Sequence, residues 1–394
     1  MNIMNRMKMT YVKIAKRLRL AELFYRIESL VISTYKSSAK QFPENLSSAL
    51  RLLHTYSPDP GTSCICHHDF VATDCDVEVI VPCYNVELYV CQCLDSILSQ
   101  KTEYSFFVTI VNDGSTDSTR SLIAKYEHLP NVKVIDQPNK GFSGARNAGI
   151  RQAHGRYLMF VDSDDILMPG AIDSLMRMTK TTEVDMVDGG FRRFADRDGD
   201  FSLIPGLASI YDMIQHDNLL SESEDTRHTN GFVCGKLISR SLFSNVEFPL
   251  GYWFEDSIYC MILEPMCMRI ASVATLVFGY RMRRSSISHS FAGKPKAIDN
   301  LYITLGLLRD RETLGIALDQ RQYDMMLHQM FMNTWCVMGL PEEVARAVFV
   351  VQRDLIAVRF GKWQTSDIRL RNIERLIRAN NFHGYMLWCK WHEC

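Results

Sequence analysis

The chain has 394 residues, of which 47% are hydrophobic and 23% are charged, and its formal net charge at pH 7 is −1. These values are ordinary for a soluble globular protein, and the length is enough for a domain of roughly 200 to 250 residues with one or two smaller parts. A net charge near zero provides no global attraction to nucleic acid or to an anionic surface. Any attraction to a membrane must therefore be local.

Residues 1–42 are predicted to form a basic amphipathic helix. Apolar side chains recur every three or four positions between Met7 and Val31, as on one face of a helix. The basic residues between them are Lys8, Lys13, Lys16, Arg17, Arg19 and Arg26. Such a helix can lie on an anionic lipid surface, or it can pack on the domain or on a partner subunit with its basic face in solvent. The sequence leaves both interpretations open.

Residues 43–76 are predicted to be a linker, because prolines interrupt the segment. It contains the cluster Cys64-Ile-Cys-His-His68, followed by Cys75. Structural zinc sites usually space paired ligands by about two to four residues and need a second pair held elsewhere by the fold. The cluster fits that pattern poorly, so incidental thiols are the favoured interpretation.

Cysteine usage and hydropathy bear on the location of the protein. The twelve cysteines are scattered without a framework, which indicates reduced thiols in the cytoplasm. The N-terminus lacks an apolar stretch of the signal-peptide type, and no run of about 18 apolar residues is uninterrupted. The sequence therefore predicts a cytoplasmic protein that neither spans nor crosses a membrane, with peripheral attachment to the inner face of the cytoplasmic membrane left open.

Three short apolar runs in the middle of the chain predict parallel strands. They cover residues 77–81, 106–111 and 157–161, are rich in β-branched and aromatic residues, and close on turn formers and carboxylates. Helical patterns follow the first two runs, at residues 86–100 and 118–128. This alternation predicts a right-handed, doubly wound α/β sheet, in which ligands bind beyond the carboxyl ends of the strands.

The polar clusters that close the three runs contain candidate ligands. They are Pro82-Cys-Tyr-Asn85, Asn112-Asp-Gly-Ser-Thr-Asp117 and Asp162-Ser-Asp-Asp165. In the third cluster, Asp162 and Asp164 place two carboxylates on the same side of a turn. Carboxylate oxygens are hard ligands that suit Mg²⁺ or Mn²⁺ carrying a diphosphate. Together the clusters indicate nucleotide-sugar chemistry.

From Val77 to about Met168 the chain resembles the catalytic core of family 2 glycosyltransferases, which have the GT-A fold. The motifs are Val79-Ile-Val-Pro-Cys-Tyr-Asn85, Ile110-Val-Asn-Asp-Gly-Ser-Thr-Asp117, Asn139-Lys-Gly-Phe-Ser-Gly-Ala-Arg-Asn-Ala-Gly149 and Phe160-Val-Asp-Ser-Asp-Asp165. Four ordered motifs are more specific than any one alone. The resemblance implies a Rossmann-like, mixed α/β sheet in a catalytic domain at residues 77–290. A C-terminal helical region at residues 291–394 would follow it.

The resemblance assigns residues to a nucleotide-sugar donor, with a UDP-sugar favoured. It implies that Pro82, Tyr84 and Asn85 line the nucleotide pocket, that Glu87 assists them, and that Asp113 recognises the base or the ribose. The other donor-binding residues that it implies are Gly141, Arg146, Asp162 and Lys236. The guanidinium of Arg146 suits the diphosphate or a carboxylate that orients it. Asn112 stands where the family often has an aspartate, which leaves the identity of the base open.

The resemblance also assigns a metal ion and a catalytic pair. Asp164 would be the direct ligand of Mn²⁺ or Mg²⁺, and Asp162 would contact the ribose or metal-bound water; the ion would neutralise the diphosphate leaving group. An inverting transfer needs a carboxylate that takes the proton of the acceptor hydroxyl, and Asp256 is implied as this base, with Glu255 orienting the acceptor. The alternative is that both residues complement the dipole of a helix at residues 257–266.

The remainder of the chain gives weaker signals. Arg281, Arg283 and Arg284 follow a predicted strand at residues 273–280, and they either close on the diphosphate or form a solvated turn. His289 is not favoured as a metal ligand, because a lone histidine usually is not one. Helices are predicted at residues 301–314, 323–337 and 342–360. Aromatic and basic residues near the C-terminus suit a membrane interface, a helical lid or a homodimer contact equally well.

The sequence thus predicts an inverting, metal-dependent hexosyl- or N-acetylhexosaminyltransferase. Its acceptor would be a growing glycan or a lipid-linked saccharide in surface polysaccharide synthesis, and no nucleic-acid partner is expected. A nucleotidyltransferase would show a Gly-rich triphosphate loop with a basic residue after the first strand, which Pro82-Cys-Tyr-Asn85 lacks. A degenerate glycan-binding protein is disfavoured because Asp162, Asp164 and Asp256 are all present.

Overall fold

The computed structural model describes residues 45–180, 183–197, 200–203, 218–221, 231–283 and 290–392. The predicted amphipathic helix at residues 1–42, Arg284 and His289 lie outside these residues. The chain divides into two compact units. An α/β unit comprises Pro60–Ser290 and Leu305–Ile316, and a helical unit comprises Met1–Asp59, Phe291–Thr304 and Ala317–Cys394.

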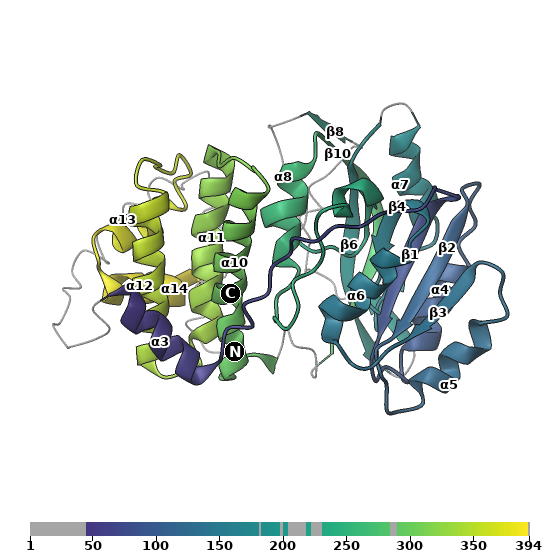
Figure 1. Cartoon of the computed structure of the whole chain (residues 1–394), viewed down its shortest axis with the longest axis horizontal. Coiled ribbons are helices and arrows are strands. Elements are labelled where there is room, and N and C mark those ends of the chain that lie inside the picture. The colour runs from purple at the N-terminus through teal and green to yellow at the C-terminus, as the bar shows by residue number, and fades with distance from the viewer. Residues whose placement is uncertain are drawn as a thin grey trace. The chain divides into compact units, whose positions relative to one another are not determined.

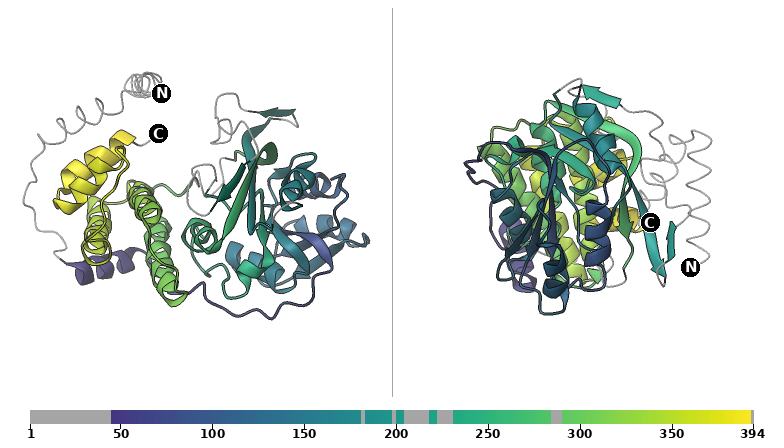
Figure 2. Two further views of the ribbon diagram at one scale, coloured as in Figure 1. Left: turned by 90° about the horizontal axis from the view of Figure 1, so that it is seen from above. Right: turned by 90° about the vertical axis from the view of Figure 1, so that its right-hand side faces the viewer.

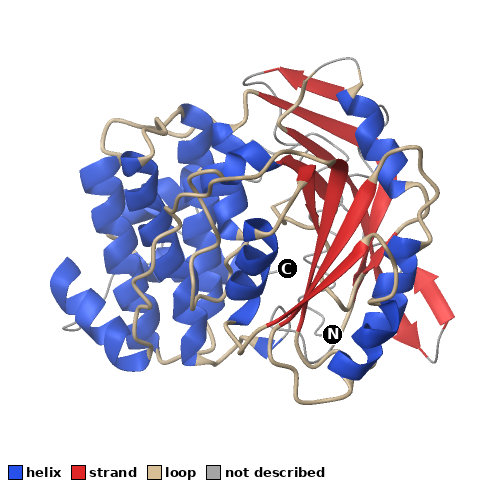
Figure 3. Cartoon of the chain, turned by 45° about the vertical axis from the view of Figure 1, so that its right-hand side comes forward, coloured by secondary structure: helices blue, strands red, loops and turns tan. Residues whose placement is uncertain are grey.

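The α/β unit is built on a mixed sheet. Its described strands are β1 (Cys75–Cys83), β2 (Phe106–Asn112), β3 (Val132–Asp136), β4 (Gly155–Phe160), β5 (Ile166–Leu167), β6 (Met186–Arg197), β7 (Asp200–Leu203), β8 (Asn218–Ser221), β9 (Lys236–Ser239) and β10 (Arg269–Arg281). Their order is β3-β2-β1-β4-β9-β6-β10-β5, with β7 paired to β6 and β8 paired to β10 (Figures 1 and 3). The first four strands in this order are parallel, whereas β9 runs antiparallel between β4 and β6.

Helices cover both faces of this sheet (Figure 2). They are α4 (Val90–Leu98), α5 (Thr119–Ile123), α6 (Gly141–Arg151), α7 (Ala171–Met176) and α8 (Glu264–Met266), with short turns η1 (Ala124–Tyr126), η2 (Arg177–Thr179), η5 (Arg240–Phe243) and η6 (Tyr259–Leu263). Because parallel strands are buried on both faces, they are apolar throughout; residues 77–83 of β1 are all buried. The predicted parallel strands and the mixed α/β class are confirmed.

The strand order places the polar loops in one crevice. From β1 the chain moves outward to β2 and β3, and it then returns across β1 to β4. Right-handed crossovers therefore put α4 and α5 on one face of the sheet and α6 on the opposite face. At such a point of reversal the loops that follow neighbouring strands diverge and leave a crevice. The loops after β1, β2 and β4 are the three polar clusters of the sequence.

The predicted helix at residues 257–266 is wound in two parts. A π-helical turn, η6, precedes the short helix α8. Pro265 lies in the first turn of α8 and has no N–H group, so it cannot donate the i→i−4 hydrogen bond of a continuous α-helix. The turn begins at the predicted catalytic pair: the N–H of Tyr259 donates to the carbonyl of Asp256 at 2.9 Å.

The helical unit confirms the three predicted C-terminal helices. Its described helices are α3 (Leu46–Tyr56), η7 (Pro295–Ile298), α10 (Asp299–Thr313), α11 (Gln320–Val337), α12 (Glu342–Arg359), α13 (Arg371–Arg378) and α14 (Phe382–His392). The final residues of α10 belong to the α/β unit. No helix in the described part of the chain has the length and apolar character needed to cross a bilayer.

Helix α3 departs from the sequence prediction, which assigns its segment to a linker. The side chain of Asn45 accepts a hydrogen bond from the N–H of Ser48 at 3.0 Å, and the hydroxyl of Ser48 accepts one from the N–H of Asn45 at 3.4 Å. This capping box satisfies donors that a helix start leaves free. Ala49 and Leu53, one turn apart, are buried, and α3 packs on α12. The prolines that flank the segment bound a helix rather than exclude one.

Candidate active site

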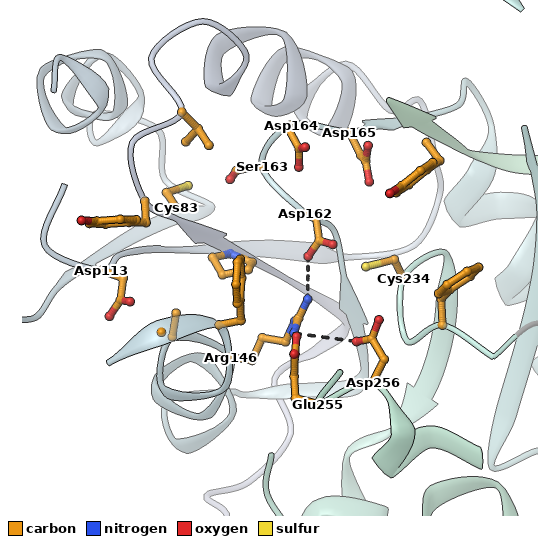
Figure 4. Close-up of a pocket in the computed structure, with 18 of the residues that line it drawn as sticks. Cys83, Asp113, Arg146, Asp162, Ser163, Asp164, Asp165, Cys234, Glu255 and Asp256 are labelled. Carbon is orange, nitrogen blue, oxygen red and sulfur yellow. Dashed lines mark hydrogen bonds and ion pairs between the residues drawn. The ribbon is translucent and has the colours of Figure 1, made fainter. Parts of the chain in front are cut away.

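The polar loops of the α/β unit surround a cavity of about 470 Å³ (Figure 4). Nine predicted site residues line it, namely Pro82, Tyr84, Asp113, Gly141, Arg146, Asp162, Asp164, Glu255 and Asp256. The other three, Asn85, Glu87 and Lys236, are not among the lining residues. The fold thus brings together most of the candidates from segments that are far apart in the sequence.

Asn85 and Glu87 join the two loops of the nucleotide side to each other. The side-chain oxygen of Asn85 accepts from the N–H of Thr116 at 2.8 Å, and a carboxylate oxygen of Glu87 accepts from the N–H of Ser118 at 2.9 Å. Asn85 has φ 49°, a left-handed conformation that asparagine tolerates better than most residues. Both side chains therefore position the loop that carries Pro82 and Tyr84, and neither lines the cavity.

Asp113 is held at the end of β2 by the loop that precedes α6. One oxygen of its buried carboxylate accepts from the side chain of Gln137 at 2.6 Å and from the backbone N–H of Lys140 at 2.9 Å. The preceding residue, Asn112, donates to Asp136 at 2.8 Å, which an aspartate at this position could not do. The side chain of Asn112, where the family often has an aspartate, therefore links the end of β2 to the end of β3.

Helix α6 begins at the cavity and carries Arg146 into it. Gly141, its first residue, has φ 74° and nothing within 4 Å of the side where a Cβ would lie, so glycine suits the turn. Further along, a Cβ on Gly149 would lie 2.5 Å from the side chain of Ile80 on β1. Glycine at this position lets the helix approach the sheet closely. The Gly-rich motif therefore sets the depth at which Arg146 enters the site.

Arg146 connects three carboxylates (Figure 4). It is only 2% exposed; its Nη2 lies 2.7 Å from Asp162 Oδ1, and its Nη1 lies 2.5 Å from Glu255 Oε1 and 3.9 Å from Asp256 Oδ1. Burial alone would lower the pKa of Arg146, but the three carboxylates more than offset it and hold the pKa well above the usual range. The guanidinium is therefore a permanent cation that positions carboxylates from both ends of the predicted site.

The carboxyl group of Asp256 has a raised pKa. Burial raises the pKa of Asp256 to about 7, and the negative charge of Glu255 acts in the same direction, while Arg146 opposes it. Its side chain is 37% exposed where it lines the cavity, and its Oδ1 accepts no hydrogen bond from the described residues. A carboxylate that faces a cavity with a pKa near neutrality has the properties of a general base.

The Asp162–Asp165 turn gathers negative charge opposite arginines of β10 and the residues after it. Burial raises the pKa of Asp164; Arg283 counteracts this and Asp162 reinforces it. The Nη2 of Arg283 lies 2.5 Å from Asp164 Oδ2. Burial also raises the pKa of Asp165 well above its usual range, and this carboxylate accepts from the N–H of Arg281 at 2.6 Å. Arg281 and Arg283 thus contact the acidic turn.

Asp162 and Asp164 fit a divalent cation. Both present hard oxygen donors, and an arginine guanidinium already occupies the place of a cation on Asp164. Burial is the main cause of the raised pKa of Asp164 and the charge of Asp162 adds to it, so a bound cation would stabilise the charged carboxylates. Two carboxylates leave the other coordination positions to a diphosphate and water, which is how Mg²⁺ is usually bound beside nucleotides.

Lys236 is enclosed and lies away from the cavity. Its ammonium is fully buried, 2.5 Å from the equally buried carboxylate of Asp188 and 4.6 Å from the ring centre of Tyr259. Burial lowers the pKa of Lys236, while Asp188 acts to raise it. In this conformation the side chain joins strand β9 to strand β6 and does not line the cavity, so the predicted role in donor binding finds no support in the lining residues.

Sequence reasoning missed the aromatic wall of the cavity. Phe142, Phe191, Phe232, Phe254, Phe278 and Tyr280 line it, as does the buried thiol of Cys234. Phe191 and Phe232 pack edge to face at 5.7 Å. Phe254 has φ 64° immediately before the acidic pair. The alternation of Phe278 and Tyr280 in β10 was the available signal, but it does not tell which face of the strand meets the cavity.

The mixed α/β sheet, with carboxylates and a buried arginine at its strand ends, has the architecture of the GT-A fold. Residues 78–246 match the model of Glycosyl transferase family 2, as the four motifs predict. Glycosyltransferase GlyA of Streptococcus pneumoniae serotype 4 is 30% identical over 228 residues, which are 56% of this chain and 32% of that protein. Minor teichoic acid biosynthesis protein GgaB of Bacillus subtilis is 28% identical over 219 residues.

The chain is similar to only a part of these relatives. The matched region is 54% of this chain and 24% of GgaB. Among solved structures, residues 1–349 of Staphylococcus aureus TarS in complex with UDP-GlcNAc superpose with a TM-score of 0.51 and 18% identity, covering 80% of this chain and 90% of that one. This likeness shows the fold, and it confirms the GT-A architecture that the motifs imply.

Proposed function

We propose that this chain is an inverting glycosyltransferase that moves a hexosyl or N-acetylhexosaminyl group from a UDP-sugar to a saccharide hydroxyl. The observation that carries the proposal is the pair of contacts that Arg146 makes with Asp162 and Glu255. One buried guanidinium contacts Asp162 at 2.7 Å, where the donor is expected, and Glu255 at 2.5 Å, where the acceptor is expected. A single cavity therefore holds a donor side and an acceptor side in fixed relation, which is what transfer between two bound substrates requires.

The donor side consists of Pro82, Tyr84 and Asp113. A proline and a half-exposed tyrosine give a flat wall for a base, and a carboxylate at the strand end can accept from the base or from ribose hydroxyls. The complex of TarS with UDP-GlcNAc supports a uridine donor for a protein of this fold. The two hydrogen bonds that Asp113 already accepts fix the orientation of its carboxylate.

Asp162 and Asp164 are the residues that would hold Mn²⁺ or Mg²⁺. When bound, the ion supplies charge neutralisation to the diphosphate as the glycosidic bond breaks. Arg283 pairs with Oδ2 of Asp164, so its guanidinium would compete with the ion for that oxygen.

Asp256 is the proposed base. Its carboxylate would take the proton of the acceptor hydroxyl as the oxygen attacks the anomeric carbon, opposite the leaving diphosphate. Glu255 is held by Arg146 and would orient the acceptor through its second oxygen. The pKa of about 7 makes Asp256 a stronger base than an ordinary carboxylate, because a proton binds it more tightly when burial disfavours its charge.

The acceptor is proposed to be a growing glycan or a lipid-linked saccharide in surface polysaccharide synthesis. The name of GgaB, a teichoic acid biosynthesis protein, supports this class. So does the aromatic wall, because the apolar faces of sugar rings pack on aromatic side chains. Phe232 is 48% exposed and Phe142 is 47% exposed, so both present open rings at the cavity.

A donor panel tests the proposal. The full chain would be incubated with Mn²⁺ and UDP-glucose, UDP-galactose, UDP-GlcNAc or GDP-mannose, and nucleotide binding and release would be measured. We expect one UDP-sugar to bind and to be slowly hydrolysed, and the sugar product of transfer to have an inverted anomeric centre by NMR. Binding of none of the UDP-sugars, or a preference for the GDP donor, would contradict the proposed donor class, and a retained configuration would contradict the mechanism.

The N-terminal residues are proposed to attach the enzyme peripherally to an anionic membrane. Each of the six basic residues contributes up to about 1 kcal/mol near such a surface. Deletion of residues 1–42 should release the protein from anionic vesicles while a soluble acceptor is still glycosylated. Salt should have the same effect, because exposed charges are screened within about 10 Å at 0.1 M. Loss of activity on every acceptor would instead assign the segment to packing or to a homodimer contact.

A further inference from the structure

One compact group of metal-ligating side chains lies outside the cavity, in the α/β unit. Among the described residues, Cys66, His68 and Glu247 form the single group of three whose ligand atoms all lie within 4.8 Å of one another. The sequence analysis disfavoured zinc in the cluster from Cys64 to Cys75, because the cluster fits the usual pattern of two ligand pairs poorly. The fold supplies that ligand, Glu247, from a distant segment.

Backbone pairing creates the group. The N–H groups of Cys66 and His68 donate to carbonyls of residues 244–245, at 3.0 and 2.8 Å. In an extended segment, side chains two positions apart point to the same face, so Cys66 and His68 lie together. The N–H of Glu247 donates to the carbonyl of Cys64 at 2.7 Å, which places the glutamate beside them. The three side chains therefore meet without any contribution from a flexible loop end.

The imidazole of His68 is available as a ligand. His68 Nε2 is buried, accepts or donates no hydrogen bond among the described residues, and lies 3.8 Å from Glu247 Oε2. A neutral imidazole binds metals through its free ring nitrogen, and a thiol that coordinates a cation is deprotonated by it.

We propose that Cys66, His68 and Glu247 bind one Zn²⁺, with water as the fourth ligand. A thiolate, an imidazole and a carboxylate together suit Zn²⁺, whereas Mg²⁺ and Mn²⁺ take oxygen ligands such as those of the catalytic turn. His67 is not the fourth ligand, because its ring is 72% exposed and contacts Asn245 and Asp69. Cys66 and His68 are spaced as Cys-x-His. Glu247 completes the site from the segment that pairs with them through backbone hydrogen bonds.

The ion would stabilise the wall behind Arg146. Phe248 follows the ligand Glu247; its ring centre lies 5.4 Å from the guanidinium carbon of Arg146, and its backbone exchanges hydrogen bonds with the side chain of Asn147 at 2.8 and 2.9 Å. Zn²⁺ would tie residues 60–74 to this segment. Arg151, at the end of α6, lies 3.0 Å from Glu247 Oε2 and competes with the ion for that oxygen.

Metal content and cobalt spectra test the site. The full chain would be stripped with a chelator and reloaded with Zn²⁺ or Co²⁺, in an Asp164→Ala background that disables the acidic turn. We expect one equivalent of Zn²⁺ by mass spectrometry and, with Co²⁺, a thiolate-to-metal charge-transfer band. Cys66→Ser should abolish the band, and His68→Gln should lower bound zinc at least tenfold at a fixed free concentration. Circular dichroism checks that both variants fold.

Matched neighbours provide the controls. Cys75→Ser and His67→Gln change the same residue types nearby and should leave stoichiometry and spectrum unchanged. Arg151→Gln removes the competitor of Glu247 and should tighten zinc binding, an effect that a merely structural cluster would not show. Zn²⁺ should raise the melting temperature of the parent and not of the Cys66→Ser variant, because a ligand that binds the native state stabilises it. Absence of the charge-transfer band, or equal zinc content in the parent and in Cys66→Ser, overturns the proposal.

Discussion

The two sides of the cavity are built in different ways. On the side of β1 and β2, the side chains of Asn85, Glu87 and Asp113 accept hydrogen bonds from backbone N–H groups of neighbouring loops. On the side of β4 and η6, carboxylates gather around arginines instead, and the pKa values of Asp164 and Asp256 are raised by burial. On the first side, hydrogen bonds to the backbone fix the positions of side chains. On the second side, buried charged groups are gathered close together.

This difference separates residues that position a ligand from residues that react. A carboxylate or amide that accepts hydrogen bonds from backbone N–H groups is held in a fixed orientation. Carboxylates crowded beside one another are sensitive to any added cation or proton, and such groups cluster at functional sites. Substitutions on the charged side should therefore alter chemistry, whereas substitutions on the other side should alter stability and donor affinity.

Asp256→Asn should have the largest effect. The amide keeps the size of the side chain but cannot take a proton, so transfer should fall by orders of magnitude while UDP-sugar binding stays within about threefold. Because the folded pKa of about 7 lies above the usual value, the charge of Asp256 destabilises the folded protein increasingly as pH rises from about 4 to 7. At pH 8 the variant should melt at the same temperature as the parent or higher.

Steady-state kinetics, calorimetric donor titration and thermal melts check this prediction. Glu255→Gln is the matched control, because it removes the neighbouring charge and leaves the proposed base in place. An unchanged transfer rate in Asp256→Asn would move the role of base elsewhere, most simply to Glu255.

Asp164→Ala should have the second largest effect. Loss of a direct metal ligand should lower transfer by well over tenfold and sharply weaken Mn²⁺-dependent UDP binding, while the fold remains, because the partner Arg283 is 25% exposed and can turn toward solvent. Activity above about a tenth of the parent's corresponds to a change of only about 1.4 kcal/mol, too little for a lost ligand. Binding of UDP measured with and without Mn²⁺ separates this result from a general loss of donor affinity.

The parallel half of the sheet is predictable from the sequence because its signals are local. Each strand is a short apolar run, each loop is a turn motif, and the loop residues follow the strand by fixed offsets. The sequence alone therefore places Pro82, Asp113 and Asp162 at one edge of the sheet. The motifs do not reveal which loop residues face inward. Asn85 and Glu87 belong to the same motif as Tyr84, yet they bond to the neighbouring loop.

The remainder depends on long-range pairing. The family resemblance assigns Lys236 to the donor, but its partner in the structure is Asp188 on an adjacent strand. Only the register of β6 and β9 brings these two residues together. The sequence indicates Arg146 as a donor or orienting residue but does not reveal its three carboxylate partners. Cys66 and His68 likewise give a weak metal signal until the fold brings Glu247 beside them.

The pH profile tests the charged side further, with a smaller effect. For the free enzyme, kcat/KM should rise with pH through about 7, since only the deprotonated form of Asp256 accepts a proton. The charge of Glu255 raises that pKa, so Glu255→Gln should move the rising limb to lower pH. A shift to higher pH, or a limb that persists in Asp256→Asn, would show that another group titrates.

Substitution of Asn85 has the smallest predicted effect. It tests the side of β1 and β2, where side chains position the loops. Asn85→Ala removes the acceptor of the Thr116 N–H group and places alanine at φ 49°, so the free energy of unfolding should fall by about 1 to 2 kcal/mol. Asn85→Gly removes the same acceptor without the strain at positive φ, so it should be the milder variant by about 1 kcal/mol. Denaturant unfolding measures both. In each variant kcat should remain, with donor KM raised by less than about threefold, because the side chain does not line the cavity. A larger rise in KM, equal in the two variants, would show that Asn85 contacts the nucleotide directly. Asn85 would then be a donor-binding residue rather than a residue that only positions the loop.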